Sequence, residues 1–302
     1  MKTTARTAGA LQKPQGLGNV DSAPMRVALA QLDARLGDVD ANEERARAVL
    51  ADAGAAGADL VVFPELYLSG YALRGVEGTA RRPEAVGAIA TTPAFLIGFH
   101  EEGADEQTHS SAAYVEAGMA THVQRKLYLV GYPPFCEDAL FAPGSGLRAF
   151  DTRLGRFAVL VCNDAWQPFL PPIAVHGGAQ MLFMPSCSST AVADAKDTWR
   201  ELTRVTARLL ECYVVFVNRV GDEAGLSFWG GSHVVDPLGV VVAEAPRLEE
   251  ALVLAEIELE RVATRRRDLP LLGEPRFDLL VGELTRLRNE RRIDCNSGSR
   301  VV

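Results

Sequence analysis

The sequence predicts a single layered α/β domain with mixed sheets, and three observations favour this fold class. In the first half of the chain, apolar runs typical of buried strands alternate with stretches of helical periodicity. Near the end, several short strand-like runs follow one another without helices between them. No linker divides the 302 residues, and no internal repeat is evident. A chain of this length buries about three quarters of its unfolded surface, which is enough for one sizeable core.

The first elements are predicted from apolar runs and one amphipathic stretch. An apolar run predicts a strand at Met25–Leu32. The stretch Asn42–Ala53 has helical periodicity, with Asn42 as a plausible N-cap and Gly54 as its end. A continuous apolar run at Asp59–Phe63 then predicts a buried strand. Three further strands are expected at Ala94–Phe99, Ser110–Val115 and, extending the same meander, His122–Gln124.

The later elements follow a long loop rich in Gly and Pro, Val130–Gly146. The apolar run Phe157–Cys162 predicts a strand that leads straight into Asn163–Trp166. Helices are expected around Pro171–His176 and at Lys196–Cys212. The other predicted strands are Gln180–Met184, Tyr213–Asn218, and a terminal meander of Ser232–Val235, Val240–Ala243 and Leu252–Ile257.

Composition and charge argue against several classes of protein. Hydrophobic residues make up 48% and charged residues 23%, which is ordinary for a globular protein. The formal net charge of -8 favours neither nucleic acid nor an anionic membrane as a partner. There is no signal-type apolar stretch at the N-terminus and no run of 18 apolar residues. We therefore expect a cytoplasmic protein that does not enter a membrane.

The cysteines and histidines do not form a disulfide framework or a metal site in the sequence. The five cysteines include no CxxC pair, and their number is odd, so we expect reduced thiols. The five histidines are scattered and form no HxH or HExxH set. No GxxxxGK phosphate-binding motif occurs either. The sequence therefore predicts neither a metal nor a cofactor.

Three regions are expected along the chain. Residues 1–24 form a polar tail containing Gly and Pro, predicted to be flexible, although such a tail can also dock on a partner subunit. Residues 25–265 form the domain. Residues 266–302 form a C-terminal extension that is a candidate for a subunit interface.

Three residues with reactive side chains stand at or just beyond the ends of predicted strands. Glu65 follows DLVVFP, Lys126 follows THVQR, and Cys162 ends FAVLVC. Strand ends present side chains into clefts. A thiol needs a base or a positive neighbour to become a thiolate, and a lysine can stabilise an oxyanion. Taken singly, each residue has a commoner explanation: a buried cysteine, a solvated glutamate or a surface lysine.

The segments around these residues resemble the nitrilase superfamily of carbon–nitrogen hydrolases, in order and in spacing. The resemblance covers about residues 25–265. The segments that carry it are FPELYLSGY (Phe63–Tyr71), RKLYL (Arg125–Leu129), FCEDALFAPG (Phe135–Gly144), VLVCNDAW (Val159–Trp166), GAQMLFMPS (Gly178–Ser186) and FWGGSHVVDPLG (Phe228–Gly239).

This resemblance implies a fold, a set of roles and an assembly. The fold is a four-layer α-β-β-α sandwich. Glu65 is implied as general base, Lys126 as oxyanion stabiliser and Cys162 as nucleophile. Glu137 is implied as a second carboxylate that orients the lysine and the attacking water. Family members pair through their outer helices, so at least a homodimer is expected, with the C-terminal segment reaching across the interface.

The residues after the nucleophile favour an amide over a nitrile as substrate. True nitrilases usually carry Cys-Trp-Glu, whereas this chain has Cys162-Asn163-Asp164. The stretch CNDAWQPFLPPIAVHGGA is similar to the glutaminase-type domains of NAD synthetases, but no synthetase domain follows before residue 302. We therefore expect a stand-alone hydrolase that cleaves a small amide or N-carbamoyl compound through a thioester, releasing ammonia or an amine.

Three alternatives stay open: a nitrilase, an acyl-transfer member of the same superfamily, and a catalytically silent binding module. Many amidases carry a Pro-Glu pair shortly after the nucleophile, and the counterpart here is Pro168-Phe169, so the substrate is open too. The pocket candidates are aromatic, with core packing as the alternative role. They are Tyr71, Trp166, Phe228 and Trp229.

Overall fold

The computed structural model of the protein describes residues 24–104, 106–273 and 275–296, with side chains up to residue 290. The predicted flexible tail, apart from its last residue Pro24, lies outside the described residues, and so does the thiol of Cys295. The predicted domain bounds of 25 and 265 stay a prediction.

Two six-stranded sheets of mixed direction form the centre of the protein. Across the first sheet the strands are β14 (Ala251–Ile257), β1 (Met25–Gln31), β2 (Leu60–Val62), β3 (Ala94–Glu102), β4 (Thr108–Glu116) and β5 (Met119–Arg125). Across the second they are β13 (Val241–Glu244), β12 (His233–Val235), β9 (Tyr213–Asn218), β8 (Met181–Ser186), β7 (Gly155–Val159) and β6 (Phe150–Thr152). In each sheet three central strands are parallel, and antiparallel strands extend them on both sides.

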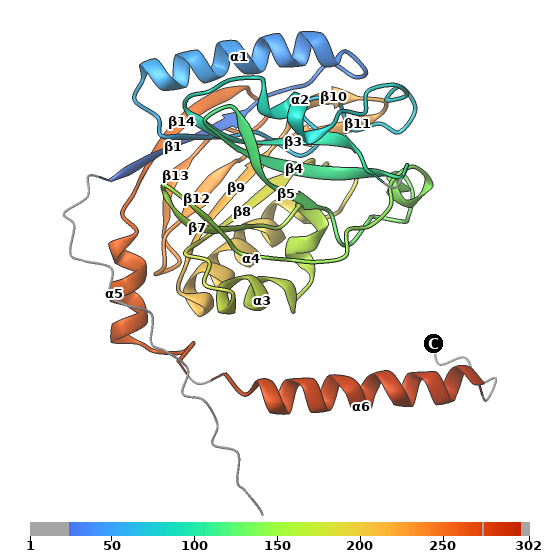
Figure 1. Ribbon diagram of the computed structural model, residues 1–302, viewed down its shortest axis with the longest axis vertical. Coiled ribbons are helices and arrows are strands. Elements are labelled where there is room, and N and C mark those ends of the chain that lie inside the picture. The colour runs from blue at the N-terminus through green and yellow to red at the C-terminus, as the bar shows by residue number, and fades with distance from the viewer. Residues whose placement is uncertain (1–23, 105, 274, 297–302) are drawn as a thin grey trace, which may run out of the picture.

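Helices cover the outer face of each sheet, which makes four layers (Figure 1). Helix α1 (Val39–Ala55) lies on the first sheet, and helices α3 (Leu170–His176) and α4 (Ala195–Leu210) lie on the second. The structure therefore confirms the predicted α-β-β-α sandwich.

Alternation along the strands explains these layers. In β1, Val27 and Leu29 face the second sheet, whereas Ala28 and Ala30 face the layer of α1. In β8, Met181 and Phe183 face the first sheet, whereas Leu182 and Met184 pack towards α3 and α4. Both faces of the central strands are thus buried, which is why these strands are continuous apolar runs in the sequence.

The structure corrects three details of the sequence prediction. Helix α1 begins at Val39, and its N-cap is Asp38, whose carboxylate accepts the N–H of Ala41. Asn42 instead lies inside the helix. Its side-chain oxygen accepts the N–H of Arg35, and its Nδ2 donates to the carbonyl oxygens of Arg35 and Leu68. A buried amide that ties two loops together leaves the same polar signal in the sequence as a cap.

The other two corrections concern strand ends and pairing. Strand β7 ends at Val159, so Cys162 does not close a strand as predicted but begins a 3₁₀ turn, η2 (Cys162–Trp166). The predicted terminal meander is also divided. β12 pairs with β13, but β14 crosses to the other sheet and pairs with β1. Sheet pairing is a long-range property that short apolar runs do not encode.

Six elements were not predicted from the sequence. They are the short helix α2 (Pro83–Gly87), strand β6, the hairpin of β10 (Val220–Glu223) and β11 (Leu226–Trp229), and the helices α5 (Glu260–Asp268) and α6 (Phe277–Asn296). Helix α6 extends away from the body of the protein (Figure 1). None of the described helices is long and apolar enough to cross a membrane.

Strand β3 passes unusually close to the loop that follows β2. The N–H of Gly98 donates to the carbonyl oxygen of Pro64 at 3.1 Å. The carbonyl oxygen of Gly98 accepts the N–H of Leu68 at 3.1 Å. A Cβ on Gly98 would lie 2.3 Å from the backbone nitrogen of Leu66. Only glycine allows this approach, which places Glu65 at the edge of the sheet.

We predict that Gly98→Ala lowers the free energy of unfolding by about 1–3 kcal/mol, because the new methyl group forces the Glu65 loop away from β3. Urea unfolding followed by circular dichroism measures this loss. The matched control is Gly282→Ala in α6, where an added Cβ meets nothing within 4 Å. That variant should keep its stability or gain up to about 1 kcal/mol. An equal loss in both variants would contradict the proposed steric cause.

Candidate active site

A buried lysine between two carboxylates forms the centre of the candidate site. Lys126 Nζ donates to Glu65 Oε1 at 2.7 Å and to Glu137 Oε1 at 2.7 Å. All three side chains are at most 1% exposed. Charges removed from water in this way are stable only when they are paired and hydrogen-bonded, so the three residues depend on one another.

Each member of this cluster follows a strand or sits in a short turn. Glu65 lies three residues after β2, and its second oxygen accepts the backbone N–H of Cys187 at 2.9 Å. Lys126 comes directly after β5, and its N–H continues the ladder by donating to Ser110. Glu137 begins the short turn η1 (Glu137–Ala139) within the long loop.

Glu137 is held by three donors. Its Oε1 accepts the hydroxyl of Tyr71 at 2.5 Å as well as Lys126, and its Oε2 accepts the backbone N–H of Val130 at 2.9 Å. A carboxylate that accepts several hydrogen bonds has little freedom to turn. Glu137 therefore fixes the direction of the lysine.

Cys162 stands on a strained turn beside this cluster. Its φ of 45° lies in the left-handed region, which is uncommon for a residue with a side chain. The carboxylate of Asp164 supports the turn by accepting the N–H groups of Leu127, Tyr128 and Val161. Asp164 therefore ties the Cys162 turn to the segment that follows Lys126.

Burial and charge set the protonation states of the site. Burial raises the pKa of Glu65 above its usual range, and the charge of Lys126 opposes this shift. Burial alone lowers the pKa of Lys126, but the charges of Glu137 and Glu65 outweigh it and hold that pKa well above its usual range. Burial, and then the charge of Glu65, raise the pKa of the Cys162 thiol. At neutral pH the site thus holds a neutral thiol next to a charged lysine.

A small cavity opens beside the thiol. It has a volume of about 70 Å³, and Cys162 is one of its lining residues. None of the side chains that line it is an acid or a base of the Asp, Glu, Lys, Arg or His type. They belong to Tyr71, Val130, Tyr132, Phe135, Cys162, Asn163, Trp166, Cys187, Ser188, Ser189, Val192 and Trp199.

The structure brings together the four residues predicted to be catalytic, although they come from four separate segments. Of the four predicted pocket residues, Tyr71 and Trp166 line the cavity. Phe228 lies behind Tyr71, with ring centroids 5.9 Å apart, and Trp229 packs on Phe216 in the core. The catalytic and substrate-binding roles of all these residues stay predictions.

Two contacts that support the site were not predicted from the sequence. The backbone N–H of Cys187 holds Glu65, and the strand end before Cys187 was a usable signal. Glu223 in the β10–β11 hairpin accepts the N–H groups of Tyr71 and Ala72, and buried Arg219 pairs with it at 2.7 Å. No local pattern points to this contact, because it joins residues about 150 positions apart.

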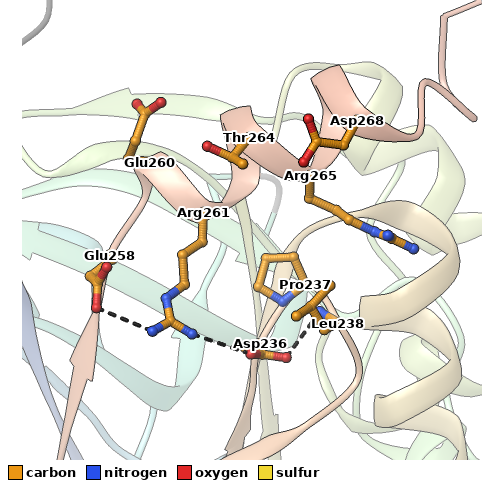
Figure 2. Close-up of a pocket in the computed structure, with 9 residues that line it drawn as sticks. All are labelled: Asp236, Pro237, Leu238, Glu258, Glu260, Arg261, Thr264, Arg265 and Asp268. Atoms are coloured by element: carbon orange, nitrogen blue, oxygen red, sulfur yellow. Dashed lines mark hydrogen bonds and ion pairs between the residues drawn. The ribbon is translucent and has the colours of Figure 1, made fainter.

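A separate hollow of about 370 Å³ lies between the β12–β13 turn, the end of β14 and α5 (Figure 2). Three of its charged side chains pair with one another, since Arg261 bridges Glu258 and Asp236. It contains no cysteine, serine or lysine, so it offers no comparable nucleophile. Among the described residues, no group of three or more His, Cys, Asp or Glu side chains is arranged to hold a metal ion.

Comparisons with known proteins agree with this geometry. The family model described as carbon-nitrogen hydrolase matches residues 26–267. A glutamine-dependent NAD(+) synthetase of Thermotoga maritima is 29% identical over 86% of this chain, but the chain spans only 48% of that protein. An (R)-stereoselective amidase of a Pseudomonas species is 30% identical over 89% of this chain and 97% of its own length.

A solved structure has the same fold and an informative active site. It is a mutant of the amidase from Nesterenkonia sp. AN1, which is 25% identical and matches with a TM-score of 0.75 over 89% of this chain and 99% of its own. In that protein, the acetamide moiety of fluoroacetamide is added covalently at the active-site cysteine.

We predict that Lys126→Met destabilises the protein far more at pH 8 than at pH 5. Without the lysine, the folded-state pKa of Glu65 rises further above its unfolded value of about 4.3. A carboxyl with a raised folded-state pKa lowers stability increasingly as pH rises above its unfolded-state pKa, and the cost disappears as falling pH protonates the group in both states. We expect a loss of about 3–5 kcal/mol at pH 8 and a clearly smaller loss at pH 5.

Urea unfolding at both pH values measures this difference. The control is Lys196→Met, at the start of α4, for which the described residues provide no ion pair. It should change the free energy of unfolding by less than about 0.5 kcal/mol at either pH. A Lys126→Met loss that is the same at pH 5 and pH 8 would show that the carboxylates do not depend on the lysine.

Proposed function

The chain belongs to the carbon–nitrogen hydrolase family, which acts on C–N bonds other than peptide bonds, and we propose that it is an amidase with Cys162 as its nucleophile. The substrate is a small amide or N-carbamoyl compound, and the products are an acid and ammonia or an amine. The observation that carries this proposal is the buried Lys126 between Glu65 and Glu137, next to the thiol.

The first half of the reaction forms a thioester. Glu65 takes the proton of the Cys162 thiol, and the thiolate attacks the acyl carbon of the amide. Because the proton stays inside the cluster, the net charge of the cluster does not change while the cluster is shielded from water. An ammonium group has three donors, and Lys126 uses two for its carboxylates, so the third is available for the oxyanion. Protonated Glu65 then gives its proton to the leaving nitrogen, the C–N bond breaks, and ammonia or an amine departs, which completes the thioester.

The second half releases the acid. Glu65 then takes a proton from water as the water oxygen attacks the thioester carbon. Collapse of this intermediate expels the thiolate, which recovers its proton from Glu65. Glu137 keeps Lys126 in place throughout.

Two observations favour an amide over the alternatives. The nucleophile is followed by Asn163-Asp164, and Asp164 is committed to three backbone N–H groups rather than to a substrate. Amidases occur among both the curated relatives and the similar solved structures. Transfer of the acyl group to an amine instead of water uses the same thioester and remains the second candidate.

We predict that Cys162→Ala abolishes release of ammonia from every amide that the wild type hydrolyses, a loss of at least about 10⁴-fold. The assay is ammonia release from a panel of small amides. Mass spectrometry of quenched wild-type enzyme should detect an acyl group on the peptide that contains Cys162.

The matched control is Cys212→Ala, which removes another buried thiol at the α4–β9 turn, away from the cavity. It should retain kcat/KM within about twofold, at a modest cost in stability. Full turnover by Cys162→Ala would disprove the proposed nucleophile. An acylated amine product in the presence of amine acceptors would favour the transfer reaction.

We also propose that two copies associate through the outer faces of α3 and α4. These faces expose Ile173, Val205 and Leu209, and an apolar groove of about 510 Å³ runs between the two helices. Helix α6 projects from the body (Figure 1), and it exposes Leu280 and other apolar side chains, whose contact with water is unfavourable. At 20 residues it is about 30 Å long, enough to lie across a partner subunit.

Light scattering coupled to size exclusion tests this assembly. The double variant Val205→Glu, Leu209→Glu should convert the dimer into a monomer, because it places charge in an apolar interface. The control is Val240→Glu, which adds the same charge at an exposed valine of the β12–β13 turn. A monomeric wild type would refute the dimer.

A nucleophilic thiol must also stay reduced, so we place the enzyme in the cytoplasm.

A further inference from the structure

Ser188, in the loop after β8, has an unusual hydrogen-bond balance. Its Oγ accepts the indole N–H of Trp199 at 3.0 Å and that of Trp229 at 3.2 Å. An indole nitrogen can only donate, and a serine hydroxyl has two acceptor sites and one hydrogen. Both acceptor sites of Ser188 are therefore filled, and its own hydrogen must be donated elsewhere.

The backbone of Ser188 is held by one buried side chain, that of Asn218. Its N–H donates to Asn218 Oδ1 at 2.8 Å, and its carbonyl oxygen accepts Asn218 Nδ2 at 3.2 Å. The residue is thus held from both sides by one buried amide. The two indoles then set the position of the hydroxyl oxygen, so the direction left for its hydrogen is fixed as well.

No described residue accepts the hydrogen of Ser188. The residue is only 8% exposed, and it lines the cavity next to Cys162. The cavity is therefore the place where an acceptor can stand. A polar hydrogen left without a partner in a largely apolar cavity is costly, so an occupant that satisfies it binds better than one that does not.

From these contacts we infer that Ser188 determines specificity by donating a hydrogen bond to an uncharged acyl group that carries an acceptor oxygen. This inference rests on the proposed amidase function and names its substrate class. The class is a short amide with an ether, hydroxyl or carbonyl oxygen near the scissile carbonyl. The lining contains no Asp, Glu, Lys, Arg or His to pair with an ionic group, which disfavours acyl groups that carry a full charge.

Two amides of equal size test the inference. Methoxyacetamide and butyramide have the same number of heavy atoms, but only the first has an ether oxygen in the chain. The quantity to compare is the ratio of their kcat/KM values, which does not depend on how much of a variant is folded. The intrinsic reactivity of the two amides cancels when this ratio is compared between variants.

We expect Ser188→Ala to lower the preference for methoxyacetamide about tenfold relative to the wild type, the effect of losing one hydrogen bond. Trp229→Phe removes one indole donor from behind the cavity. It frees an acceptor site on Ser188 and lets the hydroxyl turn, so it should lower the preference about threefold. A purely structural serine would not produce this graded response.

The matched control is Ser186→Ala, which removes a buried serine at the end of β8 that does not line the cavity and whose hydroxyl donates to the carbonyl oxygen of Met184 at 3.2 Å. Its ratio should stay within about twofold of the wild type. An unchanged ratio in Ser188→Ala, or a loss confined to Ser186→Ala, would overturn the role of Ser188 while leaving the amidase intact. A wild type that hydrolyses neither amide, nor any other amide, would instead overturn the proposed function.

Discussion

The pairing of Lys126 with two buried carboxylates is the interaction on which the rest of the site depends. None of these three charges can remain in a dry interior without the other two, since an unpaired buried charge costs several kcal/mol. The backbone N–H groups of Cys187 and Val130 and the hydroxyl of Tyr71 then satisfy the remaining carboxylate oxygens. The carboxylates are thus hydrogen-bonded before any substrate enters, and Lys126 keeps one of its three donors free within this preorganised set of charges.

The sandwich delivers these groups because it brings strand ends together. Glu65 and Lys126 follow strands of the first sheet, whereas Cys162 and Cys187 follow strands of the second. The site therefore forms only when the two sheets face each other. Gly98 lets the Glu65 loop lie directly against β3, and Asp164 ties the Cys162 turn to the segment after Lys126. Folding of the core and assembly of the site are consequently one process.

Charge is confined to one side of the site. The carboxylates and the lysine are buried and do not line the cavity, whose lining consists of aromatic, aliphatic, small and uncharged polar side chains. This division suits a reaction whose proton stays within the cluster while a neutral acyl group occupies the cavity. On the acyl side, two indoles fill the acceptor sites of Ser188 and leave its hydroxyl hydrogen as a donor toward the cavity.

The sequence by itself determined most strands and the main helices, because their apolar periodicity is local. It also identified Glu65, Lys126, Glu137 and Cys162, through segments that resemble a known family. Only the tertiary structure decided that β14 pairs with β1, that Cys162 leaves its strand for a left-handed turn, and that Tyr71 contacts Glu137. The Ser188 contacts likewise join residues 11 and 41 positions apart. The physical reason is that a local pattern records whether a side chain is buried, whereas its partner depends on how distant strands pack together.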